Sequence, residues 1–457
     1  MTMTVVSPTT GQTLREYEDL SWSEVRAAIE DAHAAHLDWR RTSFDHRAER
    51  MSRAAQILRD RTDPLAELMA HEMGKPIGQG RSEIEKCAWV CDYYAEGAAQ
   101  HLAPLTVDTP DTGAHTYVSY QPIGTVLAVM PWNFPFWQVF RFAAPNLMAG
   151  NAGLLKHASN VPGCALAIEE VFRDAGCPEG LFRSLLIGHD VAERVIEHPL
   201  VRAVTLTGSV KAGRAIAAQA GSLVKKTVLE LGGSDAYLVL EDADLDLTVE
   251  ACVTSRLVNS GQSCIAAKRF IVVRPLKEEF ERRMVERMRA ARTGDPMDEA
   301  TDVGPQARVD LREDLHRQVT ASVEAGARCL LGGEIPDGPG AFYPPTVLTN
   351  VKSGMPAYDE ELFGPVASII EAEDEAEGIR IANDTVFGLG AAVFTRDRER
   401  GERIAREELD AGACFVNAFV RSDPRLPFGG VKESGYGREL SPLGIQEFMN
   451  AKTVWVS

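Results

Sequence analysis

The chain has 457 residues and a formal net charge of −18, with 45% hydrophobic and 25% charged residues. Its length exceeds the roughly 250–300 residues at which a single core stops growing, so we expect more than one domain, folded rather than disordered. The negative charge argues against binding to nucleic acid or to an anionic membrane. It says little about small substrates, because a basic pocket can lie in an acidic protein.

The eight cysteines are scattered and form neither a CxxC pair nor a cluster with histidines. This pattern predicts no disulfide framework and no metal site, and it is typical of reduced thiols in a cytosolic enzyme. Cys87 and Cys91 could share one face of a helix, but two half-buried small side chains are the simpler interpretation. Because we find no signal-peptide pattern and no run of about 18 apolar residues, we expect a cytoplasmic protein with no membrane span.

Residues 22–100 carry apolar side chains at helical spacing, and the breakers between 74 and 78 separate two of the expected helices. Residues 105–122 change to Thr, Val, Asp, Pro and Gly and end in a segment of alternating polarity. This composition predicts an exposed hairpin, and such hairpins tend to seek a partner strand.

From residue 123 the chain alternates between strands and helices. The first block has apolar strands at 123–130, 152–156, 181–186 and 203–206, with helices at 136–148 and 161–175. A second block follows Glu230, with strand-like segments at 236–240, 270–273, 344–348, 391–394 and 414–417 and helices at 247–259 and 276–293. Strands that are apolar throughout and separated by helices predict parallel sheets covered on both faces.

The first block lacks GxGxxG, so the pattern alone leaves a nucleotide cofactor undecided. Two strand ends nevertheless offer suitable groups. Lys156 and Ser159 follow one strand, and Thr207-Gly208-Ser209 opens a helix, where free N–H groups and the helix dipole favour a phosphate. In isolation, an ordinary helix N-cap is the better interpretation of Ser209.

Cys264 lies in a stretch of small and polar residues, 258–269, and Glu230 enters a Gly-Gly turn directly after an apolar run. A thiol and a carboxylate at breaks in regular structure are a candidate nucleophile and base. Asn133, at a strand end, could donate its amide to the oxyanion formed when a thiolate attacks an aldehyde. Cys264 alone is more simply a small buried side chain, so the catalytic interpretation depends on the three residues together.

Five motifs in order resemble the aldehyde dehydrogenase superfamily over nearly the whole chain: Pro131 to Pro135, Glu230 to Gly233, Gly261 to Cys264, Glu361 to Pro365 and Pro427 to Gly430. The resemblance implies an α/β fold with two doubly wound α/β domains and a small β oligomerisation arm. It implies Cys264 as nucleophile, Glu230 as general base and Asn133 as oxyanion donor. Around the cofactor it implies Trp132, Asn133, Lys156, His157, Ala158, Ser159, Gly208, Ser209, Leu231, Glu361 and Phe363, which favours the phosphate site at Ser209.

We therefore expect a cofactor-binding domain in residues 1–104 and 123–229, a catalytic domain in 230–430, and an oligomerisation arm in 105–122 and 436–457. Because members of the superfamily exchange such arm strands between subunits, the resemblance implies a homodimer or a homotetramer.

Within the superfamily, the sequence is similar to the short bacterial succinate-semialdehyde dehydrogenases. That similarity implies Arg141 as the anchor of a substrate carboxylate, which a guanidinium binds bidentately. An ordinary helix-surface residue is the alternative interpretation of Arg141. Val258 stands where some relatives carry a second arginine, so the carboxylate needs another partner, for which Ser422 and Arg421 are candidates.

Ser159 bears on the choice of cofactor, because relatives selective for NAD often carry glutamate at this place. A serine removes the repulsion of a 2′-phosphate and can donate a hydrogen bond to it, while Lys156 adds positive charge. We therefore expect NADP to be preferred, with NAD possible.

Three alternatives stay open. One is a dehydrogenase for aromatic or medium-chain aldehydes, with Trp137, Phe140 and Phe419 lining an apolar pocket. A CoA-acylating enzyme is the second, although a water-activating Glu230 argues against it. The third is a silent binding relative, which the presence of Cys264, Glu230 and Asn133 disfavours.

Overall fold

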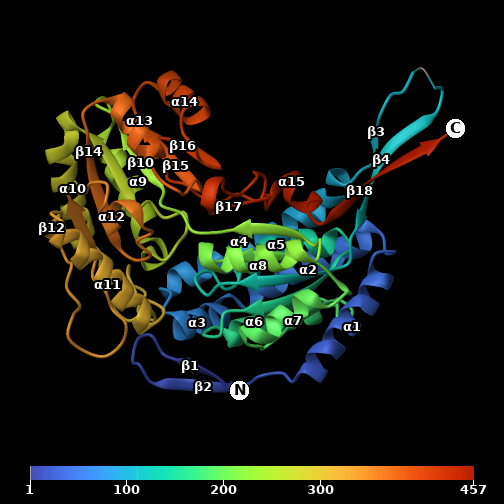
Figure 1. The fold of residues 1–457 in the computed structure, drawn as a ribbon. Helices are drawn as coiled ribbons and strands as arrows, with labels where there is room; N and C mark the ends of the chain where they lie inside the picture. Colours follow the sequence, from blue (N-terminus) through green and yellow to red (C-terminus); the bar gives the residue numbers. More distant parts are fainter. Residues whose placement is uncertain (1, 111) are drawn as a thin grey trace.

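The computed structural model describes residues 2–110 and 112–457 and contains two large sheets, a three-stranded arm and a two-stranded N-terminal ribbon (Figure 1). The six-stranded sheet has the strand order β17-β9-β8-β5-β6-β7, and the seven-stranded sheet has the order β12-β13-β14-β11-β10-β15-β16. This confirms the expected fold of two doubly wound α/β units with a small β arm.

The six-stranded sheet is parallel except for its edge strand β17, which runs antiparallel to β9. Its strands are β5 (Thr125–Met130), β6 (Ala152–His157), β7 (Phe182–Ser184), β8 (Val201–Thr207), β9 (Lys226–Glu230) and β17 (Gly435–Tyr436). The helices of this unit are α1 (Trp22–Trp39), α2 (Phe44–Asp60), α3 (Thr62–Met73), α4 (Ile77–His101), α5 (Trp137–Met148), α6 (Pro162–Asp174), α7 (His189–Glu197) and α8 (Val210–Ser222).

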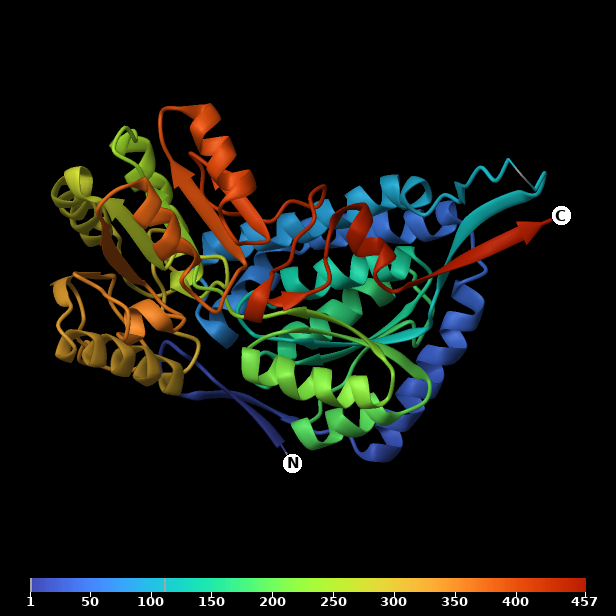
Figure 2. The same cartoon turned by 45° about the horizontal axis from the view of Figure 1, so that its top comes forward.

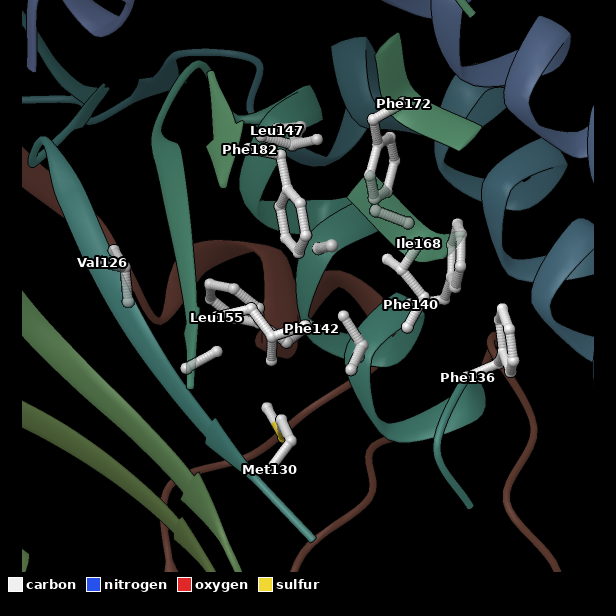
Figure 3. Close-up of a cluster of buried hydrophobic side chains, with 14 of the residues drawn as sticks. Val126, Met130, Phe136, Phe140, Phe142, Leu147, Leu155, Ile168, Phe172 and Phe182 are labelled. Carbon is white, nitrogen blue, oxygen red and sulfur yellow. The ribbon is translucent and has the colours of Figure 1, made fainter. Parts of the chain in front are cut away.

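Helix α5 is buried along its whole length, which explains why most of its residues are apolar, while its polar residues Gln138, Arg141 and Asn146 find partners inside the protein. Its Phe140 ring lies 5.1 Å from the ring of Phe172, which in turn lies 4.9 Å from that of Phe182 (Figure 3). These rings join α5 and α6 to β7. The start of α5 is therefore held firmly against the sheet.

The seven-stranded sheet is parallel except for β12, which runs antiparallel to β13. Its strands are β10 (Ala236–Val239), β11 (Arg269–Val273), β12 (Arg328–Leu331), β13 (Thr346–Thr349), β14 (Val366–Ala372), β15 (Gly390–Phe394) and β16 (Ala413–Val416). The accompanying helices are α9 (Leu245–Leu257), α10 (Lys277–Ala290), α11 (Val309–Glu324), α12 (Pro356–Asp359), α13 (Glu375–Asn383) and α14 (Arg398–Glu407).

The chain passes from one sheet to the other between β9 and β10, which only residues 231–235 separate. Glu230 thus lies at the carboxyl end of a strand in the first sheet, and the next strand begins the second sheet. In Figure 2 the two units lie side by side, with the C-terminal segment running between them toward the arm.

The arm consists of β3 (Leu105–Thr106), β4 (His115–Pro122) and β18 (Met449–Val456), with β4 in the middle (Figure 1). The antiparallel pairing of β3 with β4 confirms a hairpin within 105–122. Residue 111 of this segment lies outside the described residues. The expected arm boundary at 436 is wrong. Tyr436 pairs with Leu229 in the six-stranded sheet, and helix α15 (Ser441–Gln446) packs on α4 and α5 before β18 begins.

Two further boundaries differ from expectation. Gly78 does not break a helix, since it lies inside α4, whereas Gly74 ends α3 in a left-handed conformation. The helix expected at 247–259 ends at Leu257, because Asn259 and Ser260 both have positive φ. The ribbon of β1 (Thr2–Val6) and β2 (Thr13–Glu18) had no counterpart in our expectation.

No helix among the described residues is both long enough and apolar enough to cross a membrane.

Candidate active site

The loop that carries Cys264 has an unusual backbone. Asn259, Ser260 and Gly261 have φ values of 51°, 56° and 77°, three consecutive residues in the left-handed region. A Cβ atom at Gly261 would overlap the backbone carbonyl of Gly364, so only glycine lets the segment 361–365 approach this closely. The segment then enters β11 of the seven-stranded sheet at Arg269.

Buried cations hold the carbonyl groups of this loop. Arg256 donates to the Gly261 carbonyl at 2.6 Å, and Lys268 donates to the carbonyls of Ser263 and Cys264 at 2.9 and 2.6 Å. Lys268 also lies 3.3 Å from a carboxylate oxygen of Glu361. Each cation replaces backbone hydrogen bonds that an irregular buried loop cannot make by itself.

Asn133 is fixed from both sides of its amide. Its Oδ1 accepts from Gln138 at 3.0 Å, and its Nδ2 donates to the Gln262 carbonyl at 3.0 Å. Asn259 ties the same two loops together, since its Nδ2 donates to the carbonyls of Asn133 and Gln262. An amide nitrogen carries two hydrogens, so Asn133 keeps one N–H free to bind a ligand. The carbonyl that takes the other N–H belongs to Gln262, two residues before Cys264.

Glu230 is buried at the end of β9, where the Gly208 N–H donates to its backbone carbonyl at 2.9 Å. Neither carboxylate oxygen has a hydrogen-bond partner among the described residues. The Gly-Gly turn that follows lies directly against the thiol loop, because a Cβ atom at Gly233 would be 2.7 Å from the Cys264 carbonyl oxygen. The candidate base and nucleophile therefore belong to segments in contact.

Burial dominates the acid–base properties of both groups. It raises the pKa of the Cys264 thiol to about 12, against the opposing effect of the positive charges of Arg141 and Lys268. Burial also raises the pKa of Glu230 well above its ordinary value, Glu439 raises it further, and Arg141 and Arg438 lower it. Burial therefore favours the protonated form of both groups, and an ionised Glu230 would be a strong base in this dry site.

The carboxyl edge of the six-stranded sheet carries the expected cofactor residues. The ends of β6, β5, β8 and β9 are neighbours, so Lys156, Trp132, Gly208 and Glu230 all lie along one edge. Such an edge is where open parallel sheets bind ligands. Ser159 and Ser209 are exposed, and Ser209 is the N-cap of α8, accepting from the Ala212 N–H at 3.3 Å.

Lys156 is buried, and its ammonium donates to the His157 carbonyl at 3.1 Å. No carboxylate of the described residues lies within ion-pair distance of it. The side chain therefore offers a positive charge near the exposed hydroxyl of Ser159. Together with the free N–H groups at the start of α8, these residues fit a phosphorylated dinucleotide.

The remaining expected residues divide into two groups. Trp132 and Phe363 face each other edge to face at 5.7 Å, and Glu361 accepts from the Gly233 N–H at 3.0 Å, so all three border the junction of the sheets. His157 and Leu231 point into the protein. Burial lowers the pKa of His157 to about 4, and its ring contacts the carbonyls of Met130 and Pro135, which positions the loop before α5. Ala158 is half-buried between Lys156 and Ser159.

Arg141 is buried and pairs with the carboxylate of Glu439, while its Nη2 donates to Thr207 at 3.2 Å. The alternative of a helix-surface residue is therefore wrong. Ser422 is buried and accepts from Lys86, at 2.7 Å, whereas Arg421 is exposed. The structure thus brings an acidic partner to Arg141 and a basic one to Ser422.

The expected apolar pocket does not form as described. Phe140 is fully buried and packs against Phe172 in the core, away from any site (Figure 3). Trp137 lies beneath the ammonium of Lys86, at 4.4 Å from the ring centroid, and Phe419 is half-buried. The group that packs against the ring of Trp137 is therefore the Lys86 ammonium and not another aromatic side chain.

Sequence reasoning missed Lys86, Lys268, Arg256 and Glu439. Lys268 lay within the quoted cysteine stretch, and a cation four residues after a nucleophile could have been weighed as its support. The others offered no local signal, since they look like polar residues on helices or loops.

A family model for the "Aldehyde dehydrogenase family" matches residues 1–454. The chain is 50% identical over 457 residues to a probable succinate-semialdehyde dehydrogenase [NADP(+)] of Synechocystis sp., covering 100% of both chains. It is 49% identical to a succinate-semialdehyde dehydrogenase [NADP(+)] of Mycobacterium avium, covering 100% of this chain and 97% of that one. A crystal structure of succinic semialdehyde dehydrogenase from Streptococcus pyogenes in complex with NADP+ superposes with a TM-score of 0.97, at 37% identity and 99% coverage of each chain. By its matched motifs, its fold and this full-length similarity, the chain belongs to the aldehyde dehydrogenase family.

Proposed function

We propose that this protein oxidises succinate semialdehyde to succinate with NADP+. The observation that carries the proposal is the contact between the segments of Cys264, Asn133 and Glu230 in a chain half identical, over its full length, to a probable NADP+-dependent enzyme of that activity. Such a set of thiol, amide and carboxylate supplies a nucleophile, an oxyanion donor and a base.

In the first step the Cys264 thiol gives its proton to water, and the resulting thiolate attacks the aldehyde carbon and forms a thiohemiacetal. The free amide hydrogen of Asn133 and the Cys264 backbone N–H stabilise the oxyanion, in a site where burial strengthens each hydrogen bond. The carbonyl bonds from Lys268 and Arg256 keep this loop rigid, so the donors need little rearrangement.

A nicotinamide bound at the sheet edge would supply the acceptor for the hydride that leaves the substrate carbon. Cys264 then holds the acyl group as a thioester, and Glu230 removes a proton from the water that hydrolyses it. The unpartnered oxygens of Glu230 and its raised pKa suit this role, because a carboxylate of raised pKa is a better proton acceptor.

For the cofactor, the supporting residues are Lys156, Ser159, Gly208 and Ser209 at the sheet edge. Ser159 is exposed and follows the buried Lys156 by three residues. A serine at this position, unlike an acidic residue, does not repel a 2′-phosphate. These features support a preference for NADP+ over NAD+.

For assembly, we propose a homodimer or a homotetramer built through the arm. β18 pairs with β4 on one side only among the described strands, and its Trp455 and Val456 are about half exposed, at 53% and 52%. An exposed strand edge with apolar side chains invites pairing with a second chain. Light scattering of the intact protein and of a chain ending at Phe448, which lacks β18, tests this proposal. The same number of subunits in both proteins would contradict it.

Steady-state kinetics with a panel of aldehydes tests the function. We expect kcat/KM for succinate semialdehyde to exceed that for an uncharged aldehyde of equal length by about 100-fold, and to be higher with NADP+ than with NAD+. Equal values for the two aldehydes would favour the alternative of a broad-range enzyme. A CoA thioester formed in the presence of CoA would instead show acyl transfer.

A further inference from the structure

Lys86 is a cation in contact with Trp137 and Ser422, and none of the roles described above is assigned to it. It lies on α4, half-buried, with its ammonium 4.4 Å from the ring centroid of Trp137. Trp137 stands one helical turn before Arg141 on α5, so the two side chains share a helix face. Lys86 also donates to the Ser422 hydroxyl at 2.7 Å. Three remote segments thus meet at one ammonium group.

The charges around Lys86 leave it uncompensated. Arg141 is paired with Glu439, and the two carboxylates whose charges act on Lys86, Glu83 and Asp423, are each engaged elsewhere. Glu83 pairs with Lys75, and Asp423 binds Arg425 at 2.6 Å. No carboxylate of residues 2–110 or 112–457 lies within ion-pair distance of Lys86. A half-buried cation without a paired carboxylate is well suited to receive an anion that comes from outside the chain.

The hydrogen bond to Ser422 has a direction that matters. Because the ammonium donates to Ser422 Oγ, the serine hydroxyl keeps its own hydrogen for another acceptor. Lys86 and Ser422 therefore present two adjacent donors, which suit the two oxygens of a carboxylate. The Trp137 face fixes the ammonium in place through a cation–π contact.

We propose that Lys86, together with Ser422, binds the carboxylate of the ω-carboxy aldehyde substrate and is the residue that determines specificity for acidic aldehydes. The inference rests on the proposed function, and it moves the principal carboxylate contact from Arg141 to Lys86. Arg141, neutralised by Glu439, then acts chiefly on the charge balance of Glu230 and Cys264.

The protonation of Lys86 agrees with this role. Burial and the positive charge of Arg141 together lower the pKa of Lys86 to about 8, against the opposing effects of Cys87, Glu83 and Asp423. The side chain is thus still mainly an ammonium at neutral pH. A bound carboxylate would favour the charged form, as any opposite charge within a few ångströms does.

The test compares the Lys86→Met variant with the native enzyme on succinate semialdehyde and on an uncharged aldehyde of equal length. Methionine keeps an apolar stem over Trp137, so the packing changes little. We expect the ratio of the two kcat/KM values to fall by about 10- to 100-fold, mainly through KM for the acid. Lys86→Arg should restore most of the preference, since it restores the cation.

Lys225→Met is the matched control. Lys225 is another half-buried lysine whose pKa burial lowers, and it donates to the carbonyls of Ile196 and His198 at the amino ends of β8 and β9, the edge of the sheet opposite Glu230. Its loss should reduce stability without changing the ratio between the two aldehydes. A purely structural Lys86 would behave in the same way, lowering both activities together.

The outcomes separate this inference from the proposed function. If the native enzyme does not prefer the acidic aldehyde, the proposed function fails. If the native enzyme prefers the acid and Lys86→Met keeps that preference, the function stands and Lys86 is not the carboxylate receptor. In that second case Arg141→Met should abolish the preference instead.

Discussion

The carboxyl edge of the six-stranded sheet and the cysteine loop before β11 border the same site but are built in opposite ways. At the edge, the functional groups are exposed side chains such as Ser159 and Ser209 and the free N–H groups of a helix start, on regular strands. At the loop, the backbone is left-handed over three residues, and the buried cations Arg256 and Lys268 hold its carbonyls. The edge should therefore tolerate substitutions that alter binding alone, whereas the loop couples catalysis to folding.

The Glu230→Gln variant should give the largest effect, because Glu230 belongs to the junction of the two regions. A general base contributes about 100- to 10,000-fold, so we expect the steady-state rate to fall by that factor while the first turnover stays fast. Rapid-mixing measurement of reduced cofactor would then show a burst followed by a slow phase. An equal loss in both phases would show that Glu230 takes the proton of the thiol, not that of water.

The pH dependence of kcat provides a control for this role. Burial and Glu439 raise the pKa of Glu230, against Arg141 and Arg438, and the residue acts as a base only when ionised. The rate of the native enzyme should therefore rise with pH through that raised pKa, and Glu230→Gln should lose this rise. A variant that retains the same profile would assign the titration to another group.

A pair of glycine substitutions compares the two regions directly. Gly261→Ala places a Cβ atom against the Gly364 carbonyl at a φ of 77°, so we expect a loss of about 3 kcal/mol in the free energy of unfolding. Gly208→Ala has only Leu206 nearby, at 3.7 Å, and should leave stability nearly unchanged while raising KM for the cofactor. Chemical denaturation and cofactor kinetics measure both. Equal stability losses would remove the distinction between the edge and the loop.

The sequence predicted the regular part of this molecule well, for a physical reason. Strands such as β5 and β6 are buried on both faces, so they appear as continuous apolar runs between helices. Glu230 and Asn133 follow such runs and Cys264 precedes another, β11, so each stands at a break in regular structure, and the family motifs singled out the same three residues. Their assigned roles are still predictions that the experiments above test.

The remaining features depend on contacts between distant segments. The contact of Lys86 with Ser422 and the pairing of Arg141 with Glu439 each join residues about 300 positions apart, and nothing in the local sequence specifies them. The left-handed residues after α9 resemble a continued helix in sequence, and a two-residue strand such as β17 has no periodicity to detect. These contacts set the charge around Lys86 and Arg141, and β17 sets where the chain leaves the six-stranded sheet for the arm.

A smaller effect is expected from Ser159→Glu at the edge. Glutamate would repel a 2′-phosphate and bind ribose hydroxyls instead, so the NADP+/NAD+ ratio of kcat/KM should fall by about 10- to 100-fold. Because Ser159 is exposed, the melting temperature should stay close to that of the native protein. An unchanged ratio would show that Ser159 does not face the phosphate.

Ser209→Ala should have the smallest effect and separates two interpretations of one residue. The Ser209 hydroxyl accepts from the Ala212 N–H at 3.3 Å, so its loss should cost about 1 kcal/mol of stability, as for other N-caps. If Ser209 is only an N-cap, KM for NADP+ stays constant. If its exposed hydroxyl also donates to a phosphate, KM rises several-fold, and Ser209→Thr, which keeps the hydroxyl, retains most of the native affinity. One hydroxyl can accept from the helix and donate to a ligand at the same time. The second result would therefore show that cofactor binding at the edge depends on a local helix cap, whereas the cysteine loop depends on the buried cations Arg256 and Lys268.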